Sequence, residues 1–273
     1  MEKKLPPFSL LMAVYSKDNP EYFNDAFESI AANTLLPDEI VLVEDGPLNS
    51  SLEEVVSRWS QLLNIIIVPL KENVGLGAAL NKGLSYCRNE IIIRADADDL
   101  NRKYRFLMQV EYLYLNPDID ILSGWVEEFN IIPGDKGKVR KVPSNSHLIE
   151  FSKKRCPFNH PAVAFRKNII ISVGGYKNEH LYEDYALWMR VLNAGYKGDN
   201  LPEILVDMRF SDEALNRRGG FKYAVSEIKS QWVFYRRGYI NILQFTRNIV
   251  FRAVIRMLPN RFRVFFYKRL LRG

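Results

Sequence analysis

The first hundred residues of this 273-residue chain alternate short apolar runs with segments whose apolar residues recur every three or four positions. The first pattern is typical of buried strands, and the second of helices that pack one face on a core. We predict strands at 8–15, 39–43, 64–68 and from 91 onward, separated by helices at 20–32, 52–62 and 78–87. This alternation predicts an α/β fold with a mostly parallel, doubly wound sheet and helices on both faces.

The second hundred residues carry a less regular pattern. Predicted helices span 103–115, 147–154 and 182–194, and predicted strands span 119–130, 161–166 and 201–210. Gly124 interrupts the first of these strands, and Gly195 follows the last helix where a left-handed glycine is favoured. We therefore expect one α/β domain over 1–210, with halves at about 1–100 and 101–210, followed by a tail over 211–273.

The composition is that of a folded protein. The hydrophobic fraction of 47% supports a packed core and argues against disorder. Cys87 and Cys156 stand far apart and without metal-ligand spacing, which fits reduced thiols in a cytosolic protein better than a disulfide framework. The apolar run at 8–15 is too short to span a bilayer and is followed by no cleavage site of signal-peptide type.

Charge is distributed unevenly along the chain. The formal net charge is +6, yet from Arg217 onward fourteen lysines and arginines stand against Glu227 alone. A mildly acidic body therefore carries a strongly basic tail. Such asymmetry predicts an anionic partner for the tail, which is a membrane surface, a nucleic acid or an acidic protein.

The tail has the pattern of an amphipathic helix over 239–258, ended by Pro259. Its polar residues recur at steps of three and four, and they are Asn241, Gln244, Asn248, Arg252 and Arg256. Residues 261–272 mix aromatic residues with cations, so we expect the tail to lie on an anionic membrane surface without crossing it. The alternative is a helical pair that packs on the α/β domain or forms a dimer. A nucleic-acid partner is disfavoured, because no binding module or stacking motif is present.

Acidic residues gather where the predicted strands end. Asp96, Asp98 and Asp99 directly follow the apolar run that begins at Ile91. Three carboxylates at one strand end repel one another unless a cation joins them, and a hard divalent cation with a phosphate behind it is the commonest such guest. The alternative is a solvated turn in which Asp99 or Asn101 caps a helix.

Several other strand ends point to the same place. Tyr15, the pair Glu44-Asp45 and the loop after Val68 each follow a predicted parallel strand. Ligands of doubly wound sheets bind outside the carboxyl ends of the strands, so these residues and the acidic run are expected to share one crevice. This convergence favours the metal site over the solvated turn.

Three further motifs allow more than one interpretation. Asn73-x-Gly75-x-Gly77 either contacts a ligand or forms a flexible turn before a helix, and Asn81 on that helix reaches the crevice or ties a loop. Glu183-Asp184 opens a helix, where acids complement the helix dipole, but a carboxylate facing the crevice would serve as a general base. His160 either bonds to backbone or contacts an acceptor or a phosphate.

In this order the motifs resemble glycosyltransferase family 2, whose members are inverting, nucleotide-sugar-dependent enzymes with the GT-A fold. The resemblance covers about residues 8–210 and includes the Asp-x-Asp motif at Asp96–Asp98. The stretch 157–166, with Gly174-Gly-Tyr176, is similar to a bacterial subgroup that builds O-antigen, capsule and exopolysaccharide repeat units. One departure is Glu44, where the family more often has a second aspartate.

The resemblance implies a role for each matching residue. It implies nucleotide-sugar binding for one set: Val14, Tyr15, Glu44, Asp45, Asn73, Gly75, Asn81, Arg94, Asp96 and Ala97. It implies a metal, Mn²⁺ or Mg²⁺, on Asp98 with Asp99 assisting, and a catalytic base at Asp184 with Glu183 beside it. His160, Trp188 and Arg190 are candidates for contacts with the acceptor or a phosphate.

The function that the resemblance implies is inverting transfer of a hexose, with galactose or glucose favoured, from a UDP-sugar to a saccharide acceptor. A lipid-pyrophosphate-linked sugar is the expected acceptor, and the expected location is cytoplasmic, peripheral on the inner face of the cell membrane. Residues 1–100 would form the nucleotide-sugar half and 101–210 the acceptor half. Two alternatives stay open: a sugar-phosphate nucleotidyltransferase, although its basic Gly-rich loop is missing after 8–15, and a non-catalytic nucleotide-sugar-binding scaffold.

Overall fold

The computed structural model describes residues 5–177, 182–210 and 221–253 of the chain. Within this part, nine strands form one sheet in the order β3-β2-β1-β4-β8-β6-β9-β5, with β7 paired to β6. The strands are β1 (Phe8–Val14), β2 (Glu39–Glu44), β3 (Ile65–Pro69), β4 (Ile91–Arg94), β5 (Leu100–Asn101), β6 (Ile121–Phe129), β7 (Lys138–Arg140), β8 (Ala164–Arg166) and β9 (Gly198–Arg209).

The sheet is mostly parallel, as predicted. Parallel pairs join β1 to β2 and β4, β2 to β3, and β6 to β9. The short strand β8 runs antiparallel between β4 and β6, and β5 and β7 are antiparallel to their partners. Because β1, β2, β3 and β4 run in the same direction, their carboxyl ends meet at one edge.

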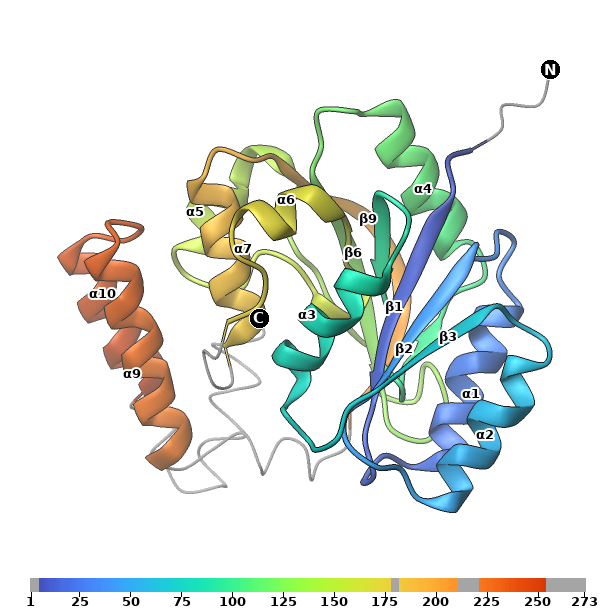
Figure 1. The fold of residues 1–273 in the computed structure, drawn as a ribbon. Helices are drawn as coiled ribbons and strands as arrows, with labels where there is room; N and C mark the ends of the chain where they lie inside the picture. The colour runs from blue at the N-terminus through green and yellow to red at the C-terminus, as the bar shows by residue number, and fades with distance from the viewer. Residues whose placement is uncertain (1–4, 178–181, 211–220, 254–273) are drawn as a thin grey trace.

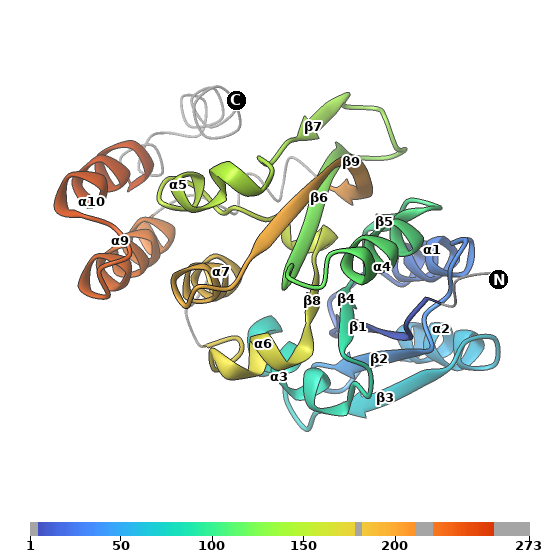
Figure 2. The ribbon, with the colours of Figure 1, turned by 90° about the horizontal axis from the view of Figure 1, so that it is seen from above.

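Helices cover both faces of the sheet (Figures 1 and 2). On one face lie α1 (Pro20–Ala31), α2 (Ser50–Ser60) and α4 (Arg105–Leu115), and on the other lie α3 (Leu76–Tyr86), α6 (Lys167–Ser172) and α7 (Glu183–Asn193). The short helix α5 (Leu148–Ser152) precedes β8 along the chain. Asn19 caps α1 by accepting the amides of Glu21 and Tyr22, and Pro20 fixes its first turn.

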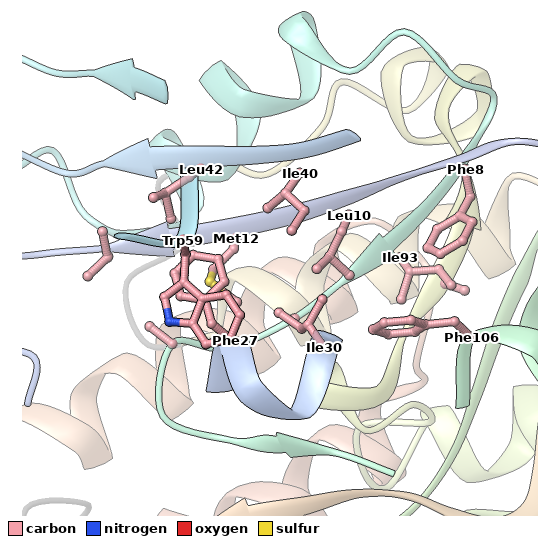
Figure 3. Packing of buried hydrophobic residues seen from close by; sticks show 14 of the residues in the cluster. Phe8, Leu10, Met12, Phe27, Ile30, Ile40, Leu42, Trp59, Ile93 and Phe106 are labelled. Atoms are coloured by element: carbon pink, nitrogen blue, oxygen red, sulfur yellow. The ribbon is translucent and has the colours of Figure 1, made fainter. Parts of the chain in front are cut away.

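The central strands are buried on both faces. Leu10 and Met12 of β1 join the cluster under α1 and α2, while Leu11 between them joins the cluster under α3. Figure 3 shows the first cluster, in which Phe27 and Trp59 stack with ring centroids 5.6 Å apart. A strand that is apolar on both faces explains the continuous apolar runs in the sequence.

The second half differs in detail from its sequence pattern. The run at 161–166 forms a 3₁₀ turn, His160–Ala162, before the short β8, and helix α6 was not predicted. β9 begins at Gly198, earlier than predicted, and its register with β6 shifts beside Gly124. A Cβ on Gly124 would lie 2.5 Å from a Leu205 side-chain carbon, so the close approach of the two strands requires glycine there.

The described part of the tail forms two helices, α9 (Phe221–Arg236) and α10 (Ile242–Asn248), which continue into a π-helical turn, Ile249–Ala253. They lie beyond α7 at one end of the molecule (Figures 1 and 2). Phe234 and Ile240 pack with Tyr182, Tyr185 and other residues at the start of α7. The tail is therefore continuous with the α/β domain in its packing.

Two tail predictions need correction. The single helix expected from residue 239 begins only at Ile242, because Asn241 and Gln244 form a capping box there. Asn248, expected on the same polar stripe as Arg252, is instead 4% exposed and bonds to Gln231 of α9 and to the Lys153 backbone. Arg256, Pro259 and 261–272 lie outside the described residues. Among those described, no helix has both the length and the apolar character needed to cross a bilayer.

Candidate active site

A cavity of about 300 Å³ lies at the carboxyl ends of the parallel strands. We call it the donor cavity, and its lining residues are Ala13, Val14, Tyr15, Asp18, Asp45, Asn73, Gly75, Leu76, Asp96, Ala97 and Asp98. These residues lie at the carboxyl end of β1 or in the segments that follow β1, β2, β3 and β4. The structure therefore brings the ends of these four strands together around one cavity, as predicted.

Asp45 organises one wall of the donor cavity. Its Oδ1 accepts the amide of Val74 at 2.7 Å, and its Oδ2 accepts the amide of Gly75 at 3.1 Å and the side-chain amide of Asn73 at 3.0 Å. Gly75 has φ of 88°, a left-handed conformation that favours glycine. The loop at Asn73 and Gly75 is therefore held in one conformation by the Asp45 carboxylate, and all three residues line the cavity. Glu44, by contrast, is not among the lining residues.

The acidic run after β4 separates into three environments. The Asp96 carboxylate pairs with the buried Arg94 guanidinium, and Asp98 extends from the cavity wall toward solvent. Asp99 is 4% exposed, and its Oδ1 accepts the backbone amide of Arg209 at 2.7 Å. Asp99 therefore joins the acidic turn to β9 and does not line the donor cavity.

Burial and mutual repulsion raise the pKa of the acids in this region. Although Asp98 is exposed as a residue, the protein around its carboxylate displaces part of its hydration. This desolvation, and next the charge of Asp96, raises the pKa of Asp98 to about 6 despite opposing cations. Burial is also the main cause for Asp99, whose pKa is well above the usual value. A site that penalises carboxylate charge in this way favours a bound cation.

The donor cavity fits a cation shared with a ligand. Among the described residues, no three His, Cys, Asp or Glu side chains converge as a metal cage. Mg²⁺ is usually held by one or two carboxylates together with substrate phosphates, and Mn²⁺ also favours oxygen ligands. Asp98 and Asp96 line the cavity and supply ligands of that type.

Asp18 is a cavity residue that the sequence reasoning missed. Its Oδ2 accepts the amide of Tyr15 at 3.0 Å, closing the turn after β1. Burial, followed by the charges of Asp98 and Asp96, raises its pKa to about 7. The available signal was an aspartate three residues beyond a strand end that was already expected to bind a ligand.

A second cavity of about 170 Å³ adjoins the first, because Leu76 lines both. We call it the acid-pair cavity, and its lining residues are Leu76, Gly77, Leu80, His160, Tyr176, Glu183 and Asp184. Glu183 and Asp184 are the first two residues of α7. The start of this helix therefore faces a cavity that shares Leu76 with the donor cavity.

His160 and Tyr176 form another part of the wall of the acid-pair cavity. The His160 Nε2 and the Tyr176 hydroxyl oxygen lie 2.9 Å apart. Burial, and then the charge of Arg94, holds the pKa of His160 well below its usual value, so the imidazole is neutral. Burial also raises the pKa of Tyr176, so its hydroxyl keeps its proton. The pair is an uncharged hydrogen-bonding unit beside two carboxylates.

Three predicted site residues support this wall and line neither cavity. Asn81 accepts the Tyr176 amide at 2.8 Å and donates to its carbonyl oxygen, and Arg190 donates to the carbonyl oxygen of Gly175. Trp188 is fully buried with its ring edge on Phe158, the centroids 5.7 Å apart. Asn81 is thus the loop tie that its alternative interpretation described.

A mostly parallel sheet with an acid-lined cavity at its switch point, beside a second pair of acids, is typical of enzymes that act on nucleotide-linked substrates. Residues 9–178 match glycosyl transferase family 2. The chain belongs to this family.

Relatives extend the match over the whole chain. A protein of Escherichia coli named UDP-Gal:alpha-D-GlcNAc-diphosphoundecaprenol beta-1,3-galactosyltransferase is 51% identical over 272 residues, which cover 100% of this chain and 99% of the relative. The amylovoran biosynthesis glycosyltransferase AmsE of Erwinia amylovora is 37% identical over 268 residues, covering 97% and 100% of the two chains.

Solved structures confirm the expected GT-A fold. The mannosyltransferase PcManGT of Pyrobaculum calidifontis, in complex with GDP-Man and Mn²⁺, has a TM-score of 0.63 at 18% identity, covering 91% of this chain and 69% of its own. TarS of S. aureus, residues 1–349 in complex with UDP-GlcNAc, also has a TM-score of 0.63, at 14% identity, with coverages of 92% and 72%. The protein is a glycosyltransferase, which sets aside the nucleotidyltransferase and the non-catalytic scaffold.

Proposed function

We propose that this enzyme transfers galactose from UDP-galactose, with inversion, to an N-acetylglucosamine carried on a lipid diphosphate. The observation that carries the proposal is the junction at Leu76 between an acid-lined donor cavity and a cavity that holds an acid pair. The choice of sugar and acceptor is supported by the Escherichia coli relative, whose name states both and whose 51% identity extends over the full chain.

In the proposed mechanism, Asp184 is the catalytic base and Glu183 stands beside it. Asp184 removes the proton from the acceptor hydroxyl while that oxygen attacks the anomeric carbon on the face opposite the diphosphate. A single displacement inverts the configuration and needs no covalent nucleophile. The position of Asp184 in the wall of a small cavity next to the donor cavity supports this role.

The donor cavity would hold the UDP group. Tyr15, 36% exposed at the cavity wall, offers a ring for stacking on the nucleobase, and the loop held by Asp45 supplies polar groups beside it. Asp98, with Asp96 next to it, would hold Mn²⁺ or Mg²⁺. When bound, such an ion supplies positive charge to the departing diphosphate.

We also propose that the enzyme docks on the cytoplasmic face of an anionic membrane. A single stripe of α9 is exposed at helical spacing and combines apolar with basic residues, namely Ile228, Lys229, Trp232 and Arg236. On α10 and the turn after it, Ile242, Leu243, Val250 and Phe251 are all more than half exposed. Apolar surface rimmed by cations is typical of helices in the plane of a bilayer, where a lipid-linked acceptor would be found.

The donor is tested by thermal stabilisation followed by product analysis. UDP-galactose, UDP-glucose and UDP-N-acetylglucosamine are compared with and without Mn²⁺, since a ligand that binds the native state raises the melting temperature. We expect UDP-galactose with Mn²⁺ to stabilise most and to yield a disaccharide on a GlcNAc-diphosphate-lipid analogue, with inverted configuration. Transfer of another sugar in preference to galactose would overturn the donor assignment.

A further inference from the structure

The residues that flank the acid pair, Glu183 and Asp184, contact the C-terminal helix α9. Tyr182 directly precedes Glu183, and its hydroxyl donates a hydrogen bond to the carboxylate of Glu227 on α9. Tyr185 directly follows Asp184, and its ring packs edge-on against Phe234 of α9, the centroids 5.1 Å apart. The residues on both sides of the acid pair therefore contact the same tail helix.

A buried polar chain continues from Tyr182 into the tail. The Glu227 Oε1 accepts from the Gln231 side-chain amide at 3.3 Å, and the Gln231 Oε1 accepts from the Asn248 side-chain amide at 2.9 Å. Asn248 also donates to the backbone oxygen of Lys153 at 2.8 Å. Glu227 and Gln231 are fully buried and Asn248 nearly so. The chain thus joins α10, α9 and the α/β domain to the first turn of α7.

Apolar side chains would have served for packing alone. Burying an amide or a carboxylate is costly unless its hydrogen bonds are made in good geometry, whereas such bonds define one relative position of the groups they join. Tyr182, at the cap position of α7, makes no side-chain capping hydrogen bond to the helix. The Tyr182–Glu227 contact supplies a constraint there by tertiary means.

We propose that Glu227 is a positioning residue for the acid pair, acting through Tyr182 on Asp184. The inference rests on the proposed role of Asp184 as the base. Misplacement of a catalytic group by about 1 Å can cost on the order of a hundred-fold in rate, so a contact made two residues before Asp184 has leverage on turnover. The C-terminal region is then part of the catalytic scaffold as well as a candidate membrane contact.

The experiment compares Tyr182→Phe with Tyr112→Phe. Tyr112, on α4, is the matched control because its hydroxyl also donates to a carboxylate, that of Asp199 on β9, 2.6 Å away. Steady-state kcat and the KM for donor and acceptor are measured for both variants, together with UDP binding by calorimetry and the melting temperature. Tyr182→Phe removes one hydroxyl and keeps the ring, so it should fold.

We expect Tyr182→Phe to lower kcat by about ten-fold or more, with donor KM and UDP affinity within about two-fold of wild type, because the donor cavity is built by other elements. Glu227→Leu should lower kcat similarly, the double variant should be no worse than the worse single variant, and Glu227→Gln should restore most of the loss by keeping an acceptor oxygen. Tyr112→Phe should keep the wild-type kcat.

The inference is overturned if Tyr182→Phe keeps the wild-type kcat, or if its loss is matched by that of Tyr112→Phe, which would indicate a general effect on stability. These outcomes are separable from failure of the proposed function. If Asp184→Asn retains turnover, Asp184 is not the base, and both the proposed mechanism and this inference are rejected. If Asp184→Asn is inactive while Tyr182→Phe has the wild-type kcat, only the inference about Glu227 is rejected and the proposed function stands.

Discussion

The donor cavity and the acid-pair cavity adjoin at Leu76, yet they are built in different ways. Most lining residues of the donor cavity lie within a few positions of the end of β1, β2 or β4, or in the loop after β3. The acid-pair cavity is lined by α3, the 3₁₀ turn at His160, the loop at Tyr176 and the start of α7. The tail helix α9 contacts the residues on either side of the acid pair. A site of the first kind depends on strand order, whereas one of the second kind depends on packing between distant segments.

The largest expected effect separates the chemistry of the second cavity from binding in the first. Asp184→Asn should lower kcat by on the order of a thousand-fold, because the acceptor hydroxyl loses its base. UDP binding, measured by calorimetry, should stay close to that of wild type. Glu183→Gln is the matched control, with a smaller expected loss, and turnover in Asp184→Asn close to that of wild type would contradict the assignment.

A change in the donor cavity should have the opposite signature. Asp98→Asn should lower kcat/KM by on the order of a hundred-fold and abolish the stabilisation of the UDP complex by Mn²⁺, because a ligand beside the diphosphate is lost. Titration of Mn²⁺ against melting temperature is the measurement. Asp99→Asn is the comparison, since Asp99 bonds to Arg209 and lies outside the cavity. Equal loss of metal response in the two variants would contradict the division of roles.

Substitutions that test membrane docking should not alter either cavity. Trp232→Glu should reduce partitioning onto anionic liposomes by about ten-fold, because it places a charge in the exposed apolar stripe of α9. Transfer to a water-soluble acceptor should be unchanged. Leu62→Glu is the control, since Leu62 is 70% exposed in the turn that follows α2. Deleting the whole tail would be a poor test, because it also removes Glu227 and Phe234 from behind the acid pair.

The smallest expected effect concerns stability without ligand. Because burial and nearby carboxylates raise the pKa of Asp18 to about 7, the folded state binds a proton that the unfolded chain releases near pH 4. The protein without metal and nucleotide should therefore lose stability as pH rises from about 4 to about 7. Asp18→Asn should raise the melting temperature at pH 8 by a few degrees, and much less at pH 5.

The control for this last prediction is Asp38→Asn. Asp38 accepts the amide of Phe8 at the opposite end of β1, at 3.0 Å, and lies outside the donor cavity. It removes a comparable hydrogen bond without relieving any repulsion in the cavity. An equal gain at both pH values in Asp18→Asn, or a gain in Asp38→Asn, would show that the crowded carboxylates are not the cause.

The sequence predicted the donor cavity better than the acid-pair cavity, because strand ends can be placed from strand order and distant packing cannot. Asp45 and Asp96 could be placed in one cavity because parallel strands end at one edge of a sheet. Asp18 was not predicted, because an aspartate in the turn after a strand is as typical of turn geometry as of a ligand site. Asn81, Trp188 and Arg190 line neither cavity, because residues that hold a loop occupy the same motif as the residues that the loop presents.

The tail shows the same limit more strongly. Its amphipathic pattern predicted one helix over 239–258, and the structure begins a helix at Ile242. The pattern alone does not distinguish a polar residue facing solvent from one in a buried hydrogen-bonded chain. Asn248 belongs to the second class because it meets Gln231 and the Lys153 backbone, 17 and 95 positions away along the chain. Such partners are chosen by packing, and no local periodicity records them.

The sequence by itself determined the α/β alternation, the family and the strand-end acids, because periodicity and strand order are local properties that a parallel sheet converts into one shared edge. Only the tertiary structure decided that Asp99 bonds to β9, that the start of α7 faces the cavity and that Glu227 holds it from behind. Those facts are hydrogen bonds and packing between segments far apart in the chain, and their geometry exists only once the segments have come together.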